Sequence, residues 1–430
     1  MKQSPYPVEQ LLGMQYYVCD TEGVQGLLRQ DAEDFMVHEI SNEVKTSEEP
    51  SDKYLICRLE KKNWELQRAV KEIAKILGVS HRRISWAGTK DKHAITTQLI
   101  SLYDISETAV QNIRLKDITL TPPVGRSGQQ LSLGDLQGNR FEITIRACTP
   151  DNLEERVAQI NTCVGTGVPN YFGIQRFGVQ RPVTHLVGKQ ILLEDYKEAV
   201  RTYVGFPSEG EPESNAAARR AYLSDNDPKA ALETLPVQMR YERAILHHLA
   251  ERPDDYEGAL KSVPPKLLSM FVSAYQSWLF NMGLSHRIQE GYALSKPAPG
   301  GDRVIFQTGK TDIVGDKNAG QAEVLIKRGG RAHICLEMPG EKTVPTHSTS
   351  EQLITSLMEA DGISYASFRK AGEMTGMSFK GAVRRISLST SVESEVCDDT
   401  VRLSFSLGGP GQYATTICRE YMKADPTRMI

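Results

Sequence analysis

The chain has 430 residues, of which 40% are hydrophobic and 24% are charged. These proportions exclude a disordered or fibrous chain and favour roughly two to three globular domains. The formal net charge is −3. If the protein binds nucleic acid, its positive charge must therefore be concentrated on one part of the surface. Seven cysteines without a C-x-x-C spacing argue against a disulfide framework. They favour reduced thiols and a cytoplasmic location.

Strands and helices mix in the first 165 residues without a regular βαβ repeat. Apolar residues at helical spacing from Leu66 to Leu77 predict a helix with Asn63 as its N-cap and Gly78 at its end. Alternating apolar residues predict strands, and helical spacing predicts two more helices. The strands are expected at 34–40, 54–59, 83–87, 95–102 and 141–145, and the helices at 106–113 and 150–165. This mixture favours the α+β class.

The pattern changes after about residue 180. Helical patterns dominate residues 184–291, and the apolar segment 267–284 contains polar residues that indicate a buried helix and not a membrane span. Residues 205–228 are rich in Gly, Pro, Ser, Glu and Asp, which predicts a loop or mobile insert. Short strands with glycine turns are expected at 301–340. A strand at 401–406, the glycine loop 408–411 and a helix from Tyr413 follow.

One carboxylate stands between two ammonium groups in the segment Trp86–Ala94, on a predicted loop between strands. Lys90 and Lys92 flank Asp91 and favour its ionised form. An ionised carboxylate suits a nucleophile or a base better than a general acid. The two lysines could also bind phosphates. An ordinary surface turn would explain the same composition.

A second segment, 169–178, offers groups that suit a planar polar ligand. Its two aromatic–glycine pairs, which begin at Phe172 and at Phe177, bracket Gln175 and Arg176. Asn170 lies two residues before the first pair. Aromatic faces with amide and guanidinium donors can hold a base beside a phosphate. A turn with buried aromatic side chains is the alternative.

Positive charge is concentrated in residues 58–92, which hold ten Lys and Arg against four Asp and Glu. This stretch, with Lys327, Arg328 and Arg331, is a candidate surface for a polyanion, and a solvated helix face is the alternative. The nine histidines show no ligand pair, and no nucleotide-cofactor fingerprint is present. These absences argue against a histidine metal site and against a nucleotide cofactor.

Four motifs in this order resemble the TruD family of tRNA pseudouridine synthases, in the branch of archaeal and eukaryotic type. The matching residues are Glu33-Asp34-Phe35-x-Val37-x-Glu39, Ala87-Gly88-x-Lys90-Asp91-Lys92-x-Ala94-x-Thr96-x-Gln98, Asn170-Tyr171-Phe172-Gly173-x-Gln175-Arg176-Phe177-Gly178, and Phe405-Ser406-Leu407 with Tyr413-Ala414-Thr415 and Arg419-Glu420.

The resemblance implies a split α+β catalytic domain with a mixed, mainly antiparallel sheet, formed by residues 1–180 and 385–430. Residues 181–384 would be an inserted α+β domain specific to the family. The implied activity is isomerisation of a uridine in tRNA, typically uridine 13, to pseudouridine, without metal or cofactor. The implied partner is tRNA, with no membrane and no obligatory protein partner.

The resemblance also implies roles for single residues. Asp91 matches the catalytic aspartate, and Asn170 and Phe172 match positions that line the active site. Tyr413 falls where an aromatic side chain stacks on the target base. Arg29 falls where bacterial members carry an active-site lysine, an exchange that keeps the charge and changes the donor geometry. We expect Lys90, Lys92, Gln175 and Arg176 to bind the substrate.

Three other functions fit the same residues less well. A catalytically silent RNA-binding protein would have no need of a carboxylate among phosphate-binding groups. An RNA chaperone with incidental catalysis would keep its function in an inactive Asp91→Ala variant. A nucleoside hydrolase would release free uracil. Within the isomerase interpretation, attack of Asp91 on C1′ and removal of a proton from C2′ both remain open.

Overall fold

The computed structural model of the chain describes residues 1–47, 49, 52–121, 123–208, 210–298, 300–327, 330–409 and 411–429. The chain forms two compact units. The sheet unit is made of Cys19–Thr166 and Ser389–Ile430, and the helical unit is made of Met1–Val18 and Gly167–Leu388. The division into family domains after residues 180 and 384 stays a prediction. Two predicted residues, Arg328 and Pro410, lie outside the described ranges.

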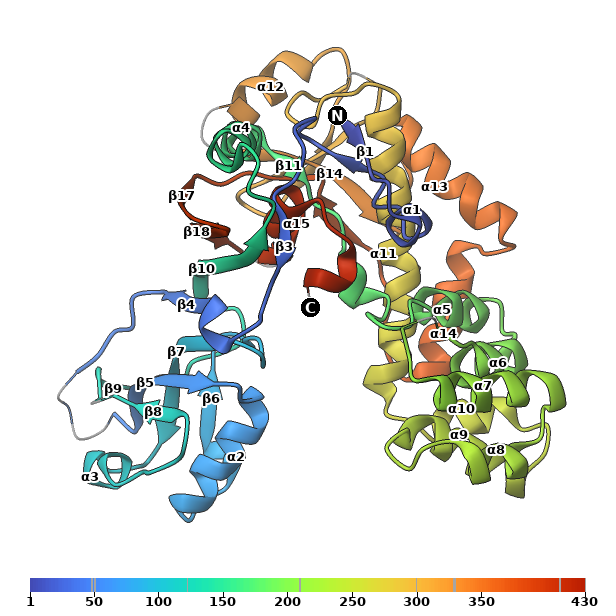
Figure 1. Cartoon of the computed structure of the whole chain (residues 1–430), viewed down its shortest axis with the longest axis horizontal. Coiled ribbons are helices and arrows are strands. Elements are labelled where there is room, and N and C mark those ends of the chain that lie inside the picture. Colours follow the sequence, from blue (N-terminus) through green and yellow to red (C-terminus); the bar gives the residue numbers. More distant parts are fainter. Residues whose placement is uncertain are drawn as a thin grey trace. The chain divides into compact units, whose positions relative to one another are not determined.

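Ten strands form one sheet in the described part of the sheet unit (Figure 1). Its main path runs through β17 (Val392–Cys397), β18 (Thr400–Gly408), β10 (Leu136–Cys148), β4 (Phe35–Ser41), β7 (Ile95–Tyr103), β5 (Tyr54–Lys62) and β8 (Ile118–Leu120). Three short strands, β3 (Gln25–Leu27), β6 (Ile84–Trp86) and β9 (Gly125–Ser127), pair with β10, β7 and β5. Only the β4–β7 pair is parallel among these described pairings, which confirms the predicted mixed, mainly antiparallel sheet.

The helices of the sheet unit cover apolar strand residues. They are α2 (Leu66–Ile76), α3 (Glu107–Gln111), α4 (Leu153–Thr166) and α15 (Ala414–Met422). The predicted helix after residue 63 is confirmed as α2, but Asn63 is not its N-cap. Asn63 has a left-handed backbone (φ 59°) and donates its N–H to the Ala94 carbonyl. The cap is Glu65, whose carboxylate accepts from the N–H groups of Gln67 and Arg68.

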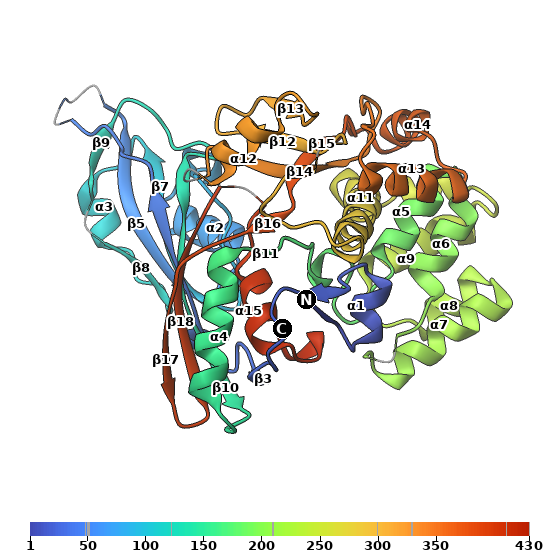
Figure 2. The ribbon, with the colours of Figure 1, turned by 90° about the horizontal axis from the view of Figure 1, so that it is seen from above.

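Helix α4 shows how the sheet gains its cover. Its buried residues Val157, Ile160 and Val164 recur at helical spacing. The helix packs on β17, and Figure 2 shows it running along the neighbouring strands of the same sheet. On β10 and β18 one face is therefore buried, while the opposite face keeps polar side chains, as is common for antiparallel sheets.

The helical unit combines a helical bundle with a small antiparallel sheet. Its helices are α1 (Pro7–Leu11), α5 (Thr184–Leu192), α6 (Tyr196–Gly205), α7 (Glu213–Asp225), α8 (Pro228–Thr234), α9 (Arg240–Glu251), α10 (Tyr256–Lys261), α11 (Pro265–Gln289), α12 (Ala319–Lys327), α13 (Thr349–Ala360) and α14 (Tyr365–Thr375). The four-stranded sheet has the order β13 (Thr311–Ile313), β12 (Arg303–Phe306), β14 (Ala332–Met338), β15 (Ala382–Arg385). Two-stranded pairs join β1 (Lys2–Gln3) to β2 (Tyr16–Tyr17) and β11 (Val168–Pro169) to β16 (Ser387–Leu388).

The prediction of a loop over residues 205–228 is wrong, because most of this segment is helix α7. The buried side chains of α7 do not form a continuous apolar stripe, because they include Arg219. Arg219 is buried and pairs with Glu211 (3.0 Å) and Glu242 (3.1 Å), and its other donors bond backbone carbonyls. The polar composition of this segment therefore gave no indication of a packed helix. Among the described residues no helix has both the length and the apolarity of a membrane span.

The bundle depends on a close approach of two helices. Helix α11 is the long yellow helix in Figure 1, and α5 packs against it. Gly188 of α5 lies so near that an added Cβ would stand 2.0 Å from the Phe271 carbonyl oxygen. The absence of a side chain at this position is thus required for the packing of the two backbones.

We predict that Gly188→Ala lowers the free energy of unfolding by about 1–3 kcal/mol, because the methyl group forces α5 and α11 apart. Gly165→Ala in α4 is the matched control. Gly165 is exposed and nothing lies within 4 Å of its added Cβ, so this change should be neutral or stabilise by about 0.5 kcal/mol. Urea unfolding of both variants tests the packing. Equal midpoints would contradict it.

Candidate active site

Asp91 lies on the turn between β6 and β7, and its carboxylate faces solvent. The side chain is 43% exposed, and its Oδ1 lies 3.4 Å from Nη2 of Arg29. The second terminal nitrogen of Arg29 donates to the His93 carbonyl at 3.0 Å. The guanidinium therefore contacts both the carboxylate and the backbone of the same turn.

Arg29 is held in place by its backbone and by an aromatic ring. It follows β3 with a left-handed backbone (φ 57°), which is unfavourable for a residue other than glycine, by about 1–3 kcal/mol. Its guanidinium carbon lies 3.8 Å from the centroid of the Phe35 ring, and its side chain is 9% exposed. The cost of this conformation is consistent with a functional role for the arginine.

Lys90 does not lie where a phosphate-binding residue is expected. It is buried, and its Nζ is 2.6 Å from Oε2 of Glu39, whose side chain is also buried. Glu39 also accepts from the Ser41 hydroxyl. The expectation that Lys90 flanks Asp91 as a cation is therefore wrong. Asp91 forms its ion pair with Arg29, which comes from a distant part of the sequence.

Lys61 is a residue of this site that the sequence analysis missed. It lies in β5, is 1% exposed, and donates from Nζ to the Asp91 carbonyl at 2.7 Å. Burial lowers the pKa of Lys61 to about 8, and the nearby Asp91 charge opposes that shift. The signal was present in β5, because Leu55, Cys57 and Leu59 are buried at alternate positions and Lys61 continues the same face.

The remaining candidate residues of the sheet unit are accessible. Lys92 is exposed beside Asp91. Tyr413 is 42% exposed and stands at the N-cap position of α15, where its carbonyl accepts from the N–H of Thr416. The preceding Gly409 and Gly411 have φ values of 86° and 79°, so the loop requires glycine at both positions. An exposed aromatic ring after such a loop is available for stacking.

Asn170 and Phe172 belong to the helical unit, where both are buried. Arg384 of β15 donates to the Asn170 side-chain oxygen at 2.9 Å, and its guanidinium carbon lies 3.9 Å from the Phe172 ring centroid. The Asn170 amide donates to the Arg385 carbonyl at 3.0 Å. These contacts fix the segment 170–172 in one conformation. Sequence analysis missed Arg384, because β15 carries no motif.

The same segment is also tied to α11. Asn281, which is fully buried, accepts from the Phe172 N–H at 2.9 Å and donates to the Phe172 and Leu12 carbonyls at 3.0 Å each. This explains a polar residue inside the apolar helix predicted over 267–284. Gln175 is exposed, and Arg176 is half-buried with its guanidinium carbon 5.2 Å from the Phe172 ring centroid. Both are placed to offer polar groups at the surface of this loop.

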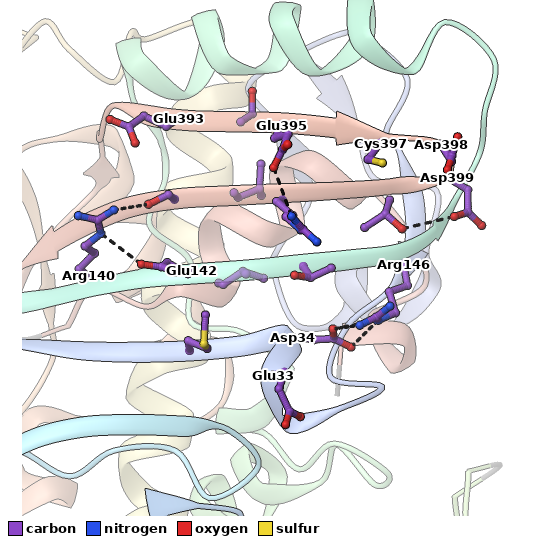
Figure 3. Close-up of a pocket in the computed structure, with 18 residues that line it drawn as sticks. Glu33, Asp34, Arg140, Glu142, Arg146, Glu393, Glu395, Cys397, Asp398 and Asp399 are labelled. Atoms are coloured by element: carbon purple, nitrogen blue, oxygen red, sulfur yellow. Dashed lines mark hydrogen bonds and ion pairs between the residues drawn. The ribbon is translucent and has the colours of Figure 1, made fainter. Parts of the chain in front are cut away.

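A hollow of about 730 Å³ lies over β4, β10, β17 and β18 and does not contain Asp91 (Figure 3). Its lining includes seven carboxylate side chains and three arginines: Glu33, Asp34, Glu142, Glu393, Glu395, Asp398 and Asp399 with Arg140, Arg146 and Arg402. Met36 lines this hollow, while its neighbour Phe35 supports Arg29. Because side chains alternate along a strand, the hollow and Asp91 lie on opposite faces of β4.

Within the described ranges, no cluster of three or more His, Cys, Asp and Glu is arranged to hold a metal ion. Of the basic stretch 58–92, Lys61 and Lys90 are buried, whereas six side chains are exposed: Arg58, Arg68, Lys71, Lys75, Arg82 and Lys92. Lys327 and Arg331 of the helical unit are exposed as well.

Comparison with known proteins gives a consistent result. A family model described as tRNA pseudouridine synthase D (TruD) matches residues 11–421. Proteins named probable tRNA pseudouridine synthase D from Methanococcoides burtonii and Methanosarcina acetivorans are 39% and 40% identical over 440 and 441 residues, which is 98% of this chain and 98% of each relative. A crystal structure of a Methanosarcina mazei protein described as tRNA pseudouridine synthase D covers 99% of both chains, with a TM-score of 0.86 and 37% identity.

We predict that Lys90→Met lowers the free energy of unfolding by about 3–5 kcal/mol at neutral pH, because it leaves the Glu39 carboxylate buried without its cation. Lys92→Met is the matched control, since Lys92 is exposed, and its effect should stay within about 0.5 kcal/mol. Urea unfolding followed by circular dichroism measures both. A Lys90→Met variant as stable as Lys92→Met would show that the ion pair is not structural.

Proposed function

The chain belongs to the TruD family of tRNA pseudouridine synthases, which are isomerases, and we propose that it isomerises uridine 13 of tRNA with Asp91 as the reacting carboxylate. The observation that carries the role of Asp91 is its exposed carboxylate beside the guanidinium of Arg29. The position within tRNA rests on the family resemblance alone.

The reaction needs a group that acts on the ribose and stays ionised. The N1–C1′ bond of the nucleotide breaks, the uracil rotates, a bond forms between C5 and C1′, C5 loses its proton and N1 gains one. Asp91 serves either by attack on C1′, which gives a covalent intermediate, or by removal of the C2′ proton, which gives a glycal. Both routes need the carboxylate in its anionic form, and the guanidinium of Arg29 lies 3.4 Å from it.

The target base must leave its stack before the carboxylate can reach the ribose, at a cost of a few kcal/mol. We propose that Tyr413 stacks on the extruded uracil, because its ring is exposed at the start of α15. For Asn170 and Phe172 we propose a role in shaping the base pocket, since their internal contacts hold the backbone of 170–172 in a fixed conformation. Gln175 and Arg176 are proposed to bind the RNA from the same loop.

Affinity for tRNA is proposed to come from exposed cations, which neutralise phosphates and release counterions. The six exposed Lys and Arg side chains of residues 58–92 supply such charges in the sheet unit. Lys90 is not among them, because its ammonium is buried against Glu39. We assign Lys90 instead to the support of the Asp91 turn.

We predict that Asp91→Asn abolishes turnover and leaves tRNA binding within about threefold of wild type. One exposed carboxylate is lost, and the cations that bind phosphates are kept. The measurement is tritium release from tRNA labelled at C5 of uridine, with filter binding beside it. Asp117→Asn, which changes an exposed carboxylate of the same unit, is the control and should keep full activity.

Two outcomes would contradict this proposal. Turnover by Asp91→Asn at the wild-type rate would remove Asp91 from the chemistry. Binding of tRNA by wild type without any tritium release would favour the silent RNA-binding protein, and free uracil among the products would favour a hydrolase. Mapping of the product nucleotide tests the assignment of position 13.

We predict that Tyr413→Phe keeps at least about one third of the wild-type kcat, whereas Tyr413→Ala loses on the order of 10- to 100-fold. Stacking on one base contributes about 1–3 kcal/mol and needs the ring but not the hydroxyl. Tritium release under single-turnover conditions compares the two variants. If Tyr413→Phe were as inactive as Asp91→Asn, the hydroxyl itself would take part, for example by accepting the C5 proton.

A further inference from the structure

We propose that Lys61 is a positioning residue of the isomerase, which holds the backbone carbonyl of Asp91 so that the carboxylate points at the ribose. This inference rests on the proposed function of Asp91. It adds a residue that has no contact with substrate and lies below the reacting group.

The contacts of Lys61 place it directly beneath the turn. Its Nζ donates to the Asp91 carbonyl at 2.7 Å, and its side chain is 1% exposed. In the sheet, Lys61 of β5 stands opposite Thr96 of β7, just after the turn, and opposite Ile118 of β8. The lysine thus reaches from a strand that is paired on both sides to the residue that carries the carboxylate.

The same turn is fixed at three other points. Gln98 donates from its amide to the Gly88 carbonyl at 2.9 Å, Lys90 pairs with Glu39, and Arg29 donates to the His93 carbonyl. An added Cβ at Gly88 would lie 2.8 Å from the Lys90 ammonium nitrogen, so a side chain there would require Lys90 to shift. Of these hydrogen bonds, the one from Lys61 is made to the backbone carbonyl of Asp91 itself.

The burial of Lys61 is unfavourable for folding, which suggests a role in function. It makes no ion pair with a carboxylate among the described residues, so its charge is compensated by a carbonyl and by more distant groups. Those groups are Asp91 and Glu65, which favour the ammonium, and Lys90, which disfavours it. A buried methionine would avoid this desolvation.

The charge of Lys61 should also be visible in the pH dependence. Burial lowers the pKa of Lys61 from 10.5 to about 8, so the ammonium form prevails at pH 7 and is lost as the pH rises through 8. A neutral amine is a weaker donor to a carbonyl. We therefore expect kcat to fall above pH 8 in the wild-type enzyme, with KM for tRNA almost unchanged.

The test compares Lys61→Met with Lys116→Met, which replaces an exposed lysine of the same unit. For Lys61→Met we expect kcat to fall on the order of 10- to 100-fold, because a misplacement of about 1 Å has that effect. KM for tRNA should stay within about twofold, since the side chain is buried. The Tm at pH 7 should be equal to or higher than that of wild type, because a buried charge is removed.

Stability and pH profile separate positioning from a merely structural role. Below the folded pKa of about 8 the wild type carries the full desolvation cost of the ammonium, and above the unfolded pKa of 10.5 it carries none. Any gain in Tm from Lys61→Met should therefore shrink between pH 8 and 10.5. The fall in kcat above pH 8 should be absent from Lys61→Met.

Three results would overturn the assignment: an unchanged kcat in Lys61→Met, a loss of activity that follows a lowered Tm, or a fall above pH 8 that persists in the variant. The proposed function fails differently. In that case wild type and Lys116→Met release no tritium either, whereas failure of the positioning role alone leaves Lys61→Met as active as both.

Discussion

The conformation of the Asp91 turn depends on two ammonium groups buried beneath it. A charge removed from water must be paired or hydrogen-bonded, because the desolvation penalty is otherwise large. Lys90 satisfies this requirement with Glu39, and Lys61 satisfies it with the Asp91 carbonyl. In this backbone conformation of the turn both lysines have a partner. The cost of burial therefore favours the one conformation that also presents the Asp91 carboxylate to solvent.

The topology of the sheet supplies the partners for these charges. Strands β4 and β7 are parallel, with Val37 opposite Thr96. This pairing brings Glu39, near the end of β4, beside the strand that follows the Asp91 turn, and the Leu99 N–H accordingly points to Glu39 at 3.4 Å. Residues of the motif that begins with Glu33 thus support the site through structural contacts. Phe35 supports Arg29, so Glu39 and Phe35 hold elements of the site in place, whereas Asp34 binds Arg146 at 2.7 Å in the acidic hollow.

Much of the fold could be predicted from the sequence, because local periodicity reports which side of an element is buried. The strands of the sheet unit and helix α2 follow from alternation and from helical spacing. Helix α7 could not be predicted in this way. Its buried Arg219 is stabilised by Glu211 and Glu242, and pairing between distant residues leaves no periodic trace in the sequence.

In the candidate site, too, part could be predicted from the sequence and part could not. Residue types were enough to single out Asp91 and the loop 170–178 as candidates, but they did not reveal which side chains contact these residues. Adjacent charges in the sequence suggested that Lys90 serves Asp91, yet Lys90 turns inward and Arg29 takes that place. Likewise Arg384, which fixes Asn170 and stacks on Phe172, comes from a strand more than 200 residues away in the chain.

The distribution of charge explains how a chain with a net charge of −3 can serve a polyanion. The face of β4 that carries Met36 belongs to the acidic hollow, where Arg146 and Arg402 are paired with Asp34 and Glu395 (Figure 3). Phe35, on the other face, supports the guanidinium beside Asp91. In the proposed binding mode, RNA phosphates would be repelled from the first face and attracted by exposed cations elsewhere in the sheet unit. Carboxylates behind the sheet thus lower the net charge without weakening the attraction near Asp91, because screening at physiological salt confines each surface charge to about 8 Å.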